Sequence, residues 1–266
     1  MGVEVLFPPN KEMADLQAII CAVAMKSTRR KEPAHEIIAV LYDTNSCKFR
    51  KGTHEANNKH ECFGSKVACS DEYLTDSDEY LTEDSLWKGE KFKCEQFNTC
   101  VVRLLRDAKI MKHWGVFEHT MFTVSVSGVS RALTHQLVRH RQDSFLQQSQ
   151  RAVEIDVSKG DWYVIPKTIA GTGWERVFQE RMKEIGLWYK ELCDAGIPEE
   201  DARYYLPNAC KTNIVITANA RQWLHIFYMR LSEHAQWEIR EMAQSILGKF
   251  MKLSPIIFEG AGELNV

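Results

Sequence analysis

Hydrophobic and polar residues alternate along the segment Met121–Val129. Phe122, Val124 and Val126 are separated by small polar residues. A period of two is typical of a strand with one buried face. Three shorter segments also predict strands: Val3–Phe7, Trp162–Ile165 and Asn213–Thr217.

Other segments carry apolar residues at the three- and four-residue spacing of a helix. These segments are Glu12–Lys26, Trp174–Cys193, and Asn219 to about Lys252, with an irregularity expected near Leu231-Ser232. On Trp174–Cys193 the apolar face is expected to include Trp188, and Gly196 closes the helix. Pro198 is expected to begin a further helix.

A helix is also predicted before the alternating segment. Asn98 is expected to cap its start, and Gly115, in His113-Trp114-Gly115, is expected to supply its stop.

The segment 28–97 follows neither pattern for most of its length. Glu36–Tyr42 predicts one strand or helix, and Asn45–Ser70 is polar and mixed. Two similar runs of seven residues follow, Asp71–Ser77 and Asp78–Asp84, which are too few for a coiled coil. We interpret this acidic stretch as a solvated insertion, with a partner-docking element as the alternative.

Composition narrows the class of protein. The 266 residues are 44% hydrophobic and 26% charged, which are globular values for one large domain or two small ones. A net charge of −2 gives no general basic field for nucleic acid. We found no apolar run long enough for a membrane span, so we expect no membrane association.

The eight cysteines and the absence of a recognisable signal segment indicate free thiols in a reducing compartment. We therefore expect a cytoplasmic protein. Cys62, Cys69, His54 and His60 offer metal-binding side chains, but their spacing matches no usual zinc pattern, and no metal site is predicted.

Candidate chemistry concentrates between Ser130 and Arg151. The segment holds four arginines and one acidic residue: Arg131, Arg139, Arg141, Arg151 and Asp143. Ser130 is expected to cap a short helix that ends at Arg139-His140-Arg141, where guanidinium groups can grip phosphate or carbonyl oxygens. A basic turn at a helix C-terminus is the alternative interpretation. Short donors follow at close spacing and favour an anion- and uracil-binding site.

The spaced pattern of Arg139-His140-Arg141, seven residues and Ser149 resembles the flavin-dependent thymidylate synthases. The resemblance covers residues 98–250 and, more faintly, 1–27. It includes His113, Phe117-Glu118-His119, Arg203, Leu206-Pro207, Asn219-Ala220-Arg221, Arg230 and His234-Ala235-Gln236-Trp237-Glu238.

That resemblance implies an α+β fold with an antiparallel sheet flanked by long helices. The chain would form one domain, 1–266, interrupted by the family-atypical insertion at about 28–97. The implied reaction methylates dUMP to dTMP. Methylenetetrahydrofolate donates the carbon, NADPH-reduced FAD supplies the hydride, and tetrahydrofolate is released. No Pro-Cys dipeptide stands in this chain, so the route with a cysteine nucleophile is not expected.

The resemblance also implies roles for residues. The dUMP ligands would be Gln136, Gln147, Ser149, Arg151, Arg203 and Arg230, of which Arg203 and Arg230 are the catalytic candidates. The FAD ligands would be His113, Arg139, His140, Arg141, Asn219, Arg221 and His225. Ser27 is a further candidate, although the arginine of the family's Ala-Arg-x-Ser segment is missing.

Some of these residues have plain alternatives. His225 and His234 can be packed histidines, and Arg230 can be a surface residue with a covered stem. On a helix, Arg230 and His234 would share a face. We interpret His234–Glu238 as helix packing and local hydrogen bonding rather than chemistry. We interpret Ser149 as a ligand rather than a nucleophile, because no adjacent base is evident.

The family implies a homotetramer with shared active sites. Gln147, Ser149 and Arg151 would meet Arg203 and Arg230 across an interface. Leu146 and Ala152 replace a small polar residue and a tyrosine common in the family, and Gly115 replaces a threonine. The alternatives are therefore methyl or hydroxymethyl transfer to another deoxypyrimidine nucleotide, or a non-catalytic nucleotide- or flavin-binding protein.

Overall fold

The computed structural model describes residues 1–27, 60–62, 65–67 and 95–264. Two compact units are present: Met1–Ala14 with Thr120–Val266, and Asp15–His119. The predictions for Glu36–Tyr42 and for the acidic near-repeat lie outside the described residues. The insertion therefore stays a prediction.

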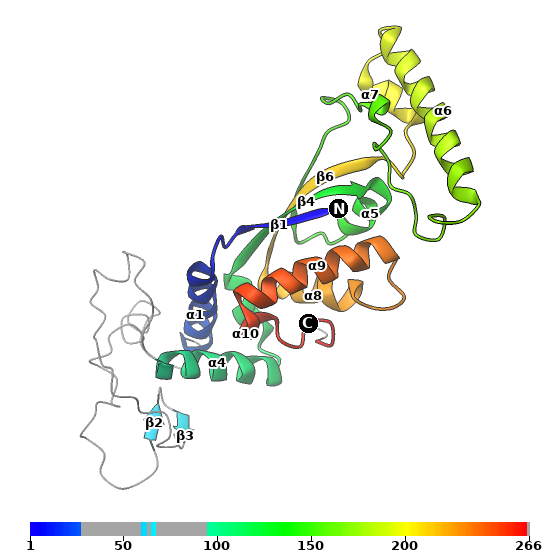
Figure 1. Cartoon of the computed structure of the whole chain (residues 1–266). Coiled ribbons are helices and arrows are strands. Elements are labelled where there is room, and N and C mark those ends of the chain that lie inside the picture. The colour runs from blue at the N-terminus through cyan, green and yellow to red at the C-terminus, as the bar shows by residue number, and fades with distance from the viewer. Residues whose placement is uncertain (28–59, 63–64, 68–94, 265–266) are drawn as a thin grey trace. The chain divides into compact units, whose positions relative to one another are not determined.

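The first unit is built on a four-stranded antiparallel sheet (Figure 1). Its spatial order is β1-β4-β6-β5. The strands are β1 (Gly2–Phe7), β4 (Met121–Ser130), β5 (Ser144–Gln147) and β6 (Lys211–Asn219). The predicted α+β class is confirmed.

The alternation that predicted β4 matches its burial. Phe122, Val124 and Val126 are fully buried, and Val124 lies opposite Ile216 of β6. On the other face, the hydroxyl groups of Thr123 and Thr217 lie 3.0 Å apart. One face of the central strand pair is therefore apolar core, as the period of two predicted.

Helices near the C-terminus complete that core: α8 (Ala220–Arg230), α9 (Trp237–Leu253) and α10 (Pro255–Phe258). The ring of Phe122 lies 5.0 Å from that of Phe250 and 4.9 Å from that of Phe258. The indole Nε1 of Trp223 donates to the Phe122 carbonyl at 3.0 Å. Aromatic packing therefore fixes these helices on the sheet.

The irregularity predicted near Leu231-Ser232 is confirmed and is wider than expected. The chain leaves the helix after Arg230 and resumes at Trp237. The prediction that Arg230 and His234 share a helix face is wrong, because α8 ends at Arg230. The side chain of Gln236, which accepts from Glu238 N and Ile239 N, supplies a new start for α9.

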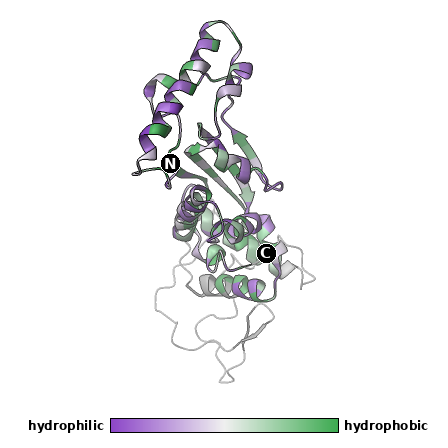
Figure 2. Ribbon diagram, turned by 90° about the vertical axis from the view of Figure 1, so that its right-hand side faces the viewer, coloured by the Kyte–Doolittle hydropathy of each residue, from purple (hydrophilic) through white to green (hydrophobic). Residues whose placement is uncertain are grey.

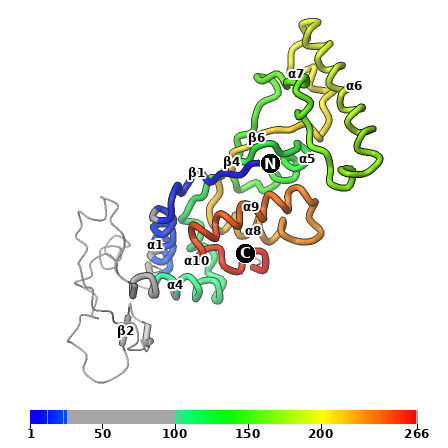
Figure 3. Tube along the Cα trace, in the orientation of Figure 1, coloured from blue at the N-terminus to red at the C-terminus, as the bar shows by residue number. Residues whose placement is uncertain are grey.

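A second apolar cluster lies beneath the long helix α6 (Trp174–Asp194) and contains Trp162, Met182 and Cys210. A Cβ at Gly186 would lie 3.2 Å from Val157, so glycine permits this close approach. Figure 2 shows hydrophilic and hydrophobic residues along α6. Figure 3 traces the chain from α6 through α7 (Glu199–Ala202) to β6.

Two predictions about this region need correction. Trp162–Ile165 forms only a single bridge, Tyr163 to Cys210, because Pro166 has no N–H to extend the pairing. Trp188 is 50% exposed, since the packed face of α6 uses Met182, Gly186 and Tyr189. The predicted stop at Gly196 is confirmed by its left-handed φ of 80°.

The second unit holds most of α1 (Lys11–Ser27), the hairpin of β2 (His60–Cys62) and β3 (Ser65–Val67), α4 (Glu95–Ile110) and the 3-10 helix η2 (Trp114–His119). Asn98 does not cap α4, which already begins at Glu95.

Gly115 is not the stop of α4 either, because it lies inside η2. Lys112 takes the left-handed position, with φ of 57°, and His113 N donates to Ala108 O at 2.8 Å. Lys112 therefore supplies the helix-ending turn that was expected of the glycine.

Candidate functional site

The short helix α5 (Arg131–Leu137) is held firmly at its start. The hydroxyl of Ser130 accepts from Leu133 N at 3.1 Å, which confirms the predicted cap. The carboxylate of Glu238 accepts from Ser130 N at 2.7 Å and from Ser130 Oγ at 2.5 Å. Glu238 is only 5% exposed, so α9 anchors the helix that leads into Arg139-His140-Arg141.

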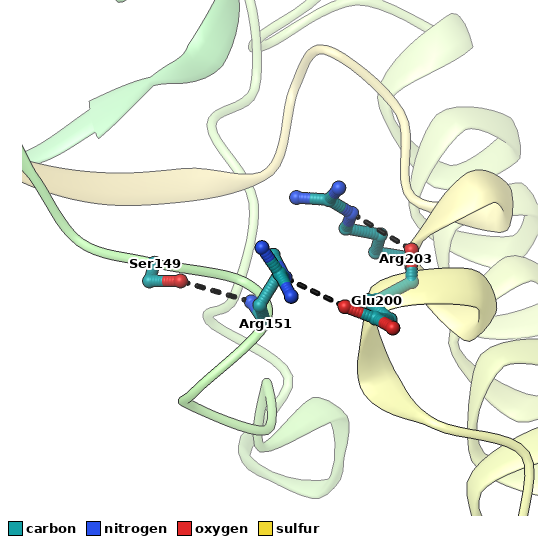
Figure 4. A network of polar contacts seen from close by, with 4 residues as sticks. All are labelled: Ser149, Arg151, Glu200 and Arg203. Carbon is teal, nitrogen blue, oxygen red and sulfur yellow. Dashed lines mark hydrogen bonds and ion pairs between the residues drawn. The ribbon is translucent and has the colours of Figure 1, made fainter.

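One group of polar side chains, here called the arginine cluster, consists of Arg131, Ser149, Arg151, Glu200 and Arg203. Arg151 Nε donates to Glu200 Oε2 at 2.6 Å, and Arg203 Nε donates to the Glu200 carbonyl at 2.9 Å. Ser149 Oγ accepts from Arg151 N at 3.1 Å. Figure 4 shows Arg151 and Arg203 reaching toward the same space from two segments.

Arg131 joins this cluster from the first turn of α5. Its Nη2 donates to the Gln148 carbonyl at 3.2 Å, immediately before Ser149. The Arg151–Glu200 pair is largely exposed, with side-chain exposures of 66% and 45%. Such a pair is weak. The Glu200 carboxylate is also the only acidic group bonded to the arginines of this cluster among the described residues. The cluster therefore has excess positive charge, which suits an anion.

A second group, here called the histidine–arginine cluster, consists of His140, His225, Arg230 and the Gln136 carbonyl. Arg230 Nε donates to His140 Nε2 at 3.1 Å, and Arg230 Nη2 donates to Gln136 O at 3.3 Å. The rings of His140 and His225 lie 5.8 Å apart, edge to face.

Burial, then the charge of Arg230, then His225 lower the pKa of His140 to about 4. His140 is therefore neutral near pH 7, and its Nε2 can accept the bond from Arg230. Burial also lowers the pKa of Arg230. A protonated His140 would place two cations in contact, so neutrality of the ring is what makes this cluster stable.

Gln147 lies on β5, a strand that the sequence pattern did not predict. Its Nε2 donates to Thr134 Oγ1 at 3.1 Å and to Thr212 Oγ1 at 3.3 Å. These bonds orient its side-chain amide between α5 and β6. Gln136 Nε2, by contrast, donates to the Ala132 carbonyl of its own helix at 3.2 Å.

The structure thus groups the predicted dUMP ligands differently from the sequence hypothesis. Arg203 lies with Arg151 through Glu200, whereas Arg230 lies with His140. Arg203 and Arg230 were expected to form one group, but within the chain they belong to different clusters.

The remaining predicted FAD ligands occupy several positions. Arg139 and Arg141 are exposed on either side of the buried His140. Asn219 caps α8 by accepting from Gln222 N at 2.9 Å, and Arg221 is half-buried on the first turn of the same helix. His113 is exposed in the second unit. The side chain of Ser27 lies outside the description.

Sequence reasoning missed Glu200 and Asp143. Glu200 sits in an acidic first turn, which the helix dipole explains without any function. Asp143 has both carboxylate oxygens buried without a partner among the described residues, and burial raises its pKa to about 7. No spacing pattern signals the contact of Glu200 or the burial of Asp143, because each depends on how distant segments fold together.

Within the described ranges, no group of three or more His, Cys, Asp or Glu side chains is placed to hold a metal ion. The side chains of His54, His60, Cys62 and Cys69 fall outside the description. None of the helices in the described part combines the length and apolarity needed to cross a bilayer.

Comparison with known proteins places this site in context. A family model described as thymidylate synthase complementing protein matches residues 56–256, so the match begins inside the segment that was interpreted as an insertion. A flavin-dependent thymidylate synthase from Geobacter sulfurreducens is 45% identical over 159 residues, covering 58% of this chain and 67% of that protein.

A second such synthase, from Sulfolobus acidocaldarius, is 40% identical over 158 residues, covering 59% of this chain and 60% of that protein. The aligned parts therefore span between three fifths and two thirds of these relatives.

Among solved structures, the chain is similar to a UMP/dUMP methylase, PolB, from Streptomyces cacaoi, bound with 5-Br dUMP. The TM-score is 0.55 and the identity 25%, over 65% of this chain and 86% of the other. The family match covers strands β4, β5 and β6 of the sheet, both clusters and helices α5 to α9. The chain thus belongs to the thymidylate synthase complementing protein family, as Arg139-His140-Arg141 and Ser149 indicated, with flavin-dependent thymidylate synthases among its relatives.

Proposed function

We propose that the chain methylates dUMP to dTMP, with methylenetetrahydrofolate as carbon donor and NADPH-reduced FAD as hydride source, and releases tetrahydrofolate. The observation that carries this proposal is that the chain provides both an arginine cluster with excess positive charge and an arginine held by a neutral histidine. The arginine cluster begins at the first residue of α5, and the histidine–arginine cluster follows its last. The seven-residue helix α5 is itself about 10 Å long.

The arginine cluster suits the phosphate of dUMP. Arg151 and Arg203 present guanidinium groups from two segments, and Ser149 adds a hydroxyl. Guanidinium groups bind phosphate through paired, charge-assisted hydrogen bonds. Gln136 and Gln147 are the proposed amide ligands of the nucleoside.

Arg230 suits the pyrimidine ring. A guanidinium near the uracil carbonyls would stabilise negative charge on the ring and make C5 more nucleophilic. The neutral His140 holds Arg230 by accepting from its Nε at 3.1 Å. We assign the catalytic roles to Arg230, at the ring, and to Arg203, at the phosphate.

The residues after α5 fit a flavin dinucleotide. Exposed Arg139 and Arg141 flank His140 and offer donors to a pyrophosphate. The other proposed contacts are His113, Asn219, Arg221 and His225. When bound, reduced FAD would supply the hydride that completes the methyl group, while these residues hold and orient it.

A different pyrimidine nucleotide is the second candidate substrate. Leu146 is 77% exposed on β5, beside Gln147, and Ala152 follows Arg151. These are two of the positions at which the chain departs from the common family pattern. PolB is described as acting on both UMP and dUMP. A non-catalytic nucleotide- or flavin-binding protein is the further alternative, and turnover separates it from both enzymes.

Assembly as a homotetramer with shared active sites is also part of the proposal. If sites are shared, Arg151 and Arg203 would come from one chain and Arg230 from another. Inactive Arg151→Ala and Arg230→Ala chains, co-folded into mixed oligomers, should then restore some turnover. Arg151→Ala with Arg203→Ala should not, because no site would contain both arginines. Verified mixed oligomers with no recovery in the first pairing would count against shared sites.

The main test begins with an absorbance spectrum and an FAD titration of the purified protein. Conversion of dUMP is then measured with methylenetetrahydrofolate and NADPH, with UMP and dCMP as competing substrates. Activity should survive Cys→Ser replacement at each cysteine. A folded protein that binds no FAD would overturn the flavin assignment. FAD and dUMP binding without any turnover would favour the non-catalytic alternative.

A further inference from the structure

Arg131 has an unexplained atom in an otherwise well-bonded region. Its Nη2 donates to the Gln148 carbonyl at 3.2 Å. Its Nε is buried and has no hydrogen-bond partner among the described residues. A buried donor without an acceptor is unfavourable, and native structures rarely leave one without a ligand, ion or water.

The charge around Arg131 is also uncompensated. Burial lowers the pKa of Arg131, the Cys210 side chain raises it, and the charge of Arg203 lowers it. Burial raises the pKa of the Cys210 thiol itself, so this thiol is uncharged at neutral pH and does not neutralise the arginine. Glu200 is already bonded to Arg151. The charges of Arg131 and Arg203 therefore repel each other without a shared counter-ion among the described residues.

We infer that Arg131 is a further substrate-binding residue, a third arginine that contacts the phosphate of a nucleoside monophosphate together with Arg151 and Arg203. The choice of dUMP as that nucleotide rests on the proposed function. A phosphate monoester carries close to two negative charges and several acceptor oxygens. It would satisfy the buried Nε and relieve the repulsion between Arg131 and Arg203.

The competing explanation is that Arg131 only supports the loop before Ser149 through its bond to Gln148 O. The two explanations differ in which ligand they affect. A phosphate contact changes the affinity for dUMP and leaves that for deoxyuridine alone, since deoxyuridine lacks the phosphate. A disordered loop would weaken the binding of both dUMP and deoxyuridine, because Gln147 and Ser149 lie in the same segment.

The test uses full-length Arg131→Gln and Arg131→Lys variants. Arg176→Gln is the matched control, because Arg176 is exposed on α6 and its ion pair with Glu180 spans 3.7 Å. Calorimetry measures the Kd of dUMP, deoxyuridine and inorganic phosphate for each. We expect Arg131→Gln to raise the dUMP Kd about 10- to 100-fold and to leave deoxyuridine unchanged. Arg131→Lys retains the charge without the planar fork and should raise it roughly 3- to 10-fold.

An unchanged dUMP Kd, or equal losses for dUMP and deoxyuridine, would overturn the inference. If Arg131→Gln fails to fold, Arg131→Lys decides, because it also removes the buried Nε. Wild-type protein that binds dUMP through its phosphate but does not methylate it would defeat the proposed function and leave this inference standing. If the wild-type protein methylates dUMP and both Arg131 variants bind dUMP normally, this inference fails and the proposed function stands.

Discussion

The two clusters differ in how completely the protein itself satisfies the charges and hydrogen bonds of their arginines. In the arginine cluster, the Arg151 side chain is 66% exposed and positive charge exceeds negative charge. In the histidine–arginine cluster, His140 is 8% exposed and accepts from Arg230 at 3.1 Å. The first is arranged to receive an anion, whereas the second already holds its own arginine in place.

This difference suggests that the arginine cluster binds the nucleotide, whereas the histidine–arginine cluster orients Arg230. Truncating an exposed arginine removes a ligand contact and leaves the core unchanged. Truncating Arg230 removes the donor to His140 Nε2 and the donor to Gln136 O together. We therefore expect substitutions in the arginine cluster to act on dUMP affinity, and substitutions at Arg230 to act mainly on turnover.

The largest effect is expected for Arg230→Ala. Removing a positioned donor that stabilises developing charge lowers turnover by about 10²- to 10³-fold. Single-turnover formation of dTMP measures it, and FAD content reports the integrity of the site. Arg240→Ala is the control, since among the described residues the Arg240 guanidinium donates only to the Glu233 carbonyl, at 3.2 Å. Turnover near the wild-type rate in Arg230→Ala would remove this residue from the chemistry.

Arg203→Ala should come next. Loss of a charge-assisted phosphate contact costs about 1.5–3 kcal/mol, so the dUMP Kd should rise about 10- to 100-fold while FAD affinity changes little. Calorimetry with each ligand measures both. Equal weakening of dUMP and FAD would show that Arg203 supports the fold of η4 (Arg203–Tyr205) rather than a phosphate.

Asp143→Asn tests the buried carboxyl that neither cluster uses. Burial raises its pKa to about 7 from an ordinary 3.8, so the folded protein retains a proton that the unfolded chain releases. Its contribution to stability is present below about pH 4 and is lost as the pH rises through 7.

Between pH 4 and pH 8, the free energy of unfolding of the Asn variant should therefore rise by about 1–2 kcal/mol relative to that of the wild type, after discounting for partial solvation. Urea unfolding at the two pH values measures this difference. An identical pH dependence in both proteins would show that Asp143 is ionised normally.

The smallest effect is expected for Glu200→Gln. Its ion pair with Arg151 is exposed, and such pairs contribute about 0.2–1 kcal/mol. The free energy of unfolding should change by less than about 1 kcal/mol, a difference that should shrink in high salt. A larger, salt-insensitive loss would mean that Glu200 is a structural support of the arginine cluster.

Local patterns predicted much of the scaffold. The alternation at Phe122, Val124 and Val126 identified a strand, and Ser130 identified a helix start, because both signals depend on neighbouring residues alone. The spaced motif indicated the family and the candidate site residues. It did not show their partners, since Arg151 and Glu200 are separated by 49 positions.

The incorrect predictions share a physical cause. β5 has only four residues, alternately exposed and half-buried, and so lacks a clear hydrophobic period. Trp188 fits the helical pattern, but the packing of α6 on Trp162 selects the Gly186 face instead. In each case tertiary contacts decided between arrangements that the local pattern allowed.

The most direct measurement compares dUMP with deoxyuridine in Arg203→Ala and Arg230→Ala. The ratio of the two Kd values isolates the contribution of the phosphate. We predict that Arg203→Ala lowers the preference for dUMP by about tenfold or more, whereas Arg230→Ala leaves it within about threefold of the wild type. The account divides the site into an arginine cluster that binds the phosphate and a histidine–arginine cluster that orients the ring. Loss of the preference for dUMP in Arg230→Ala, or its full retention in Arg203→Ala, would contradict that division.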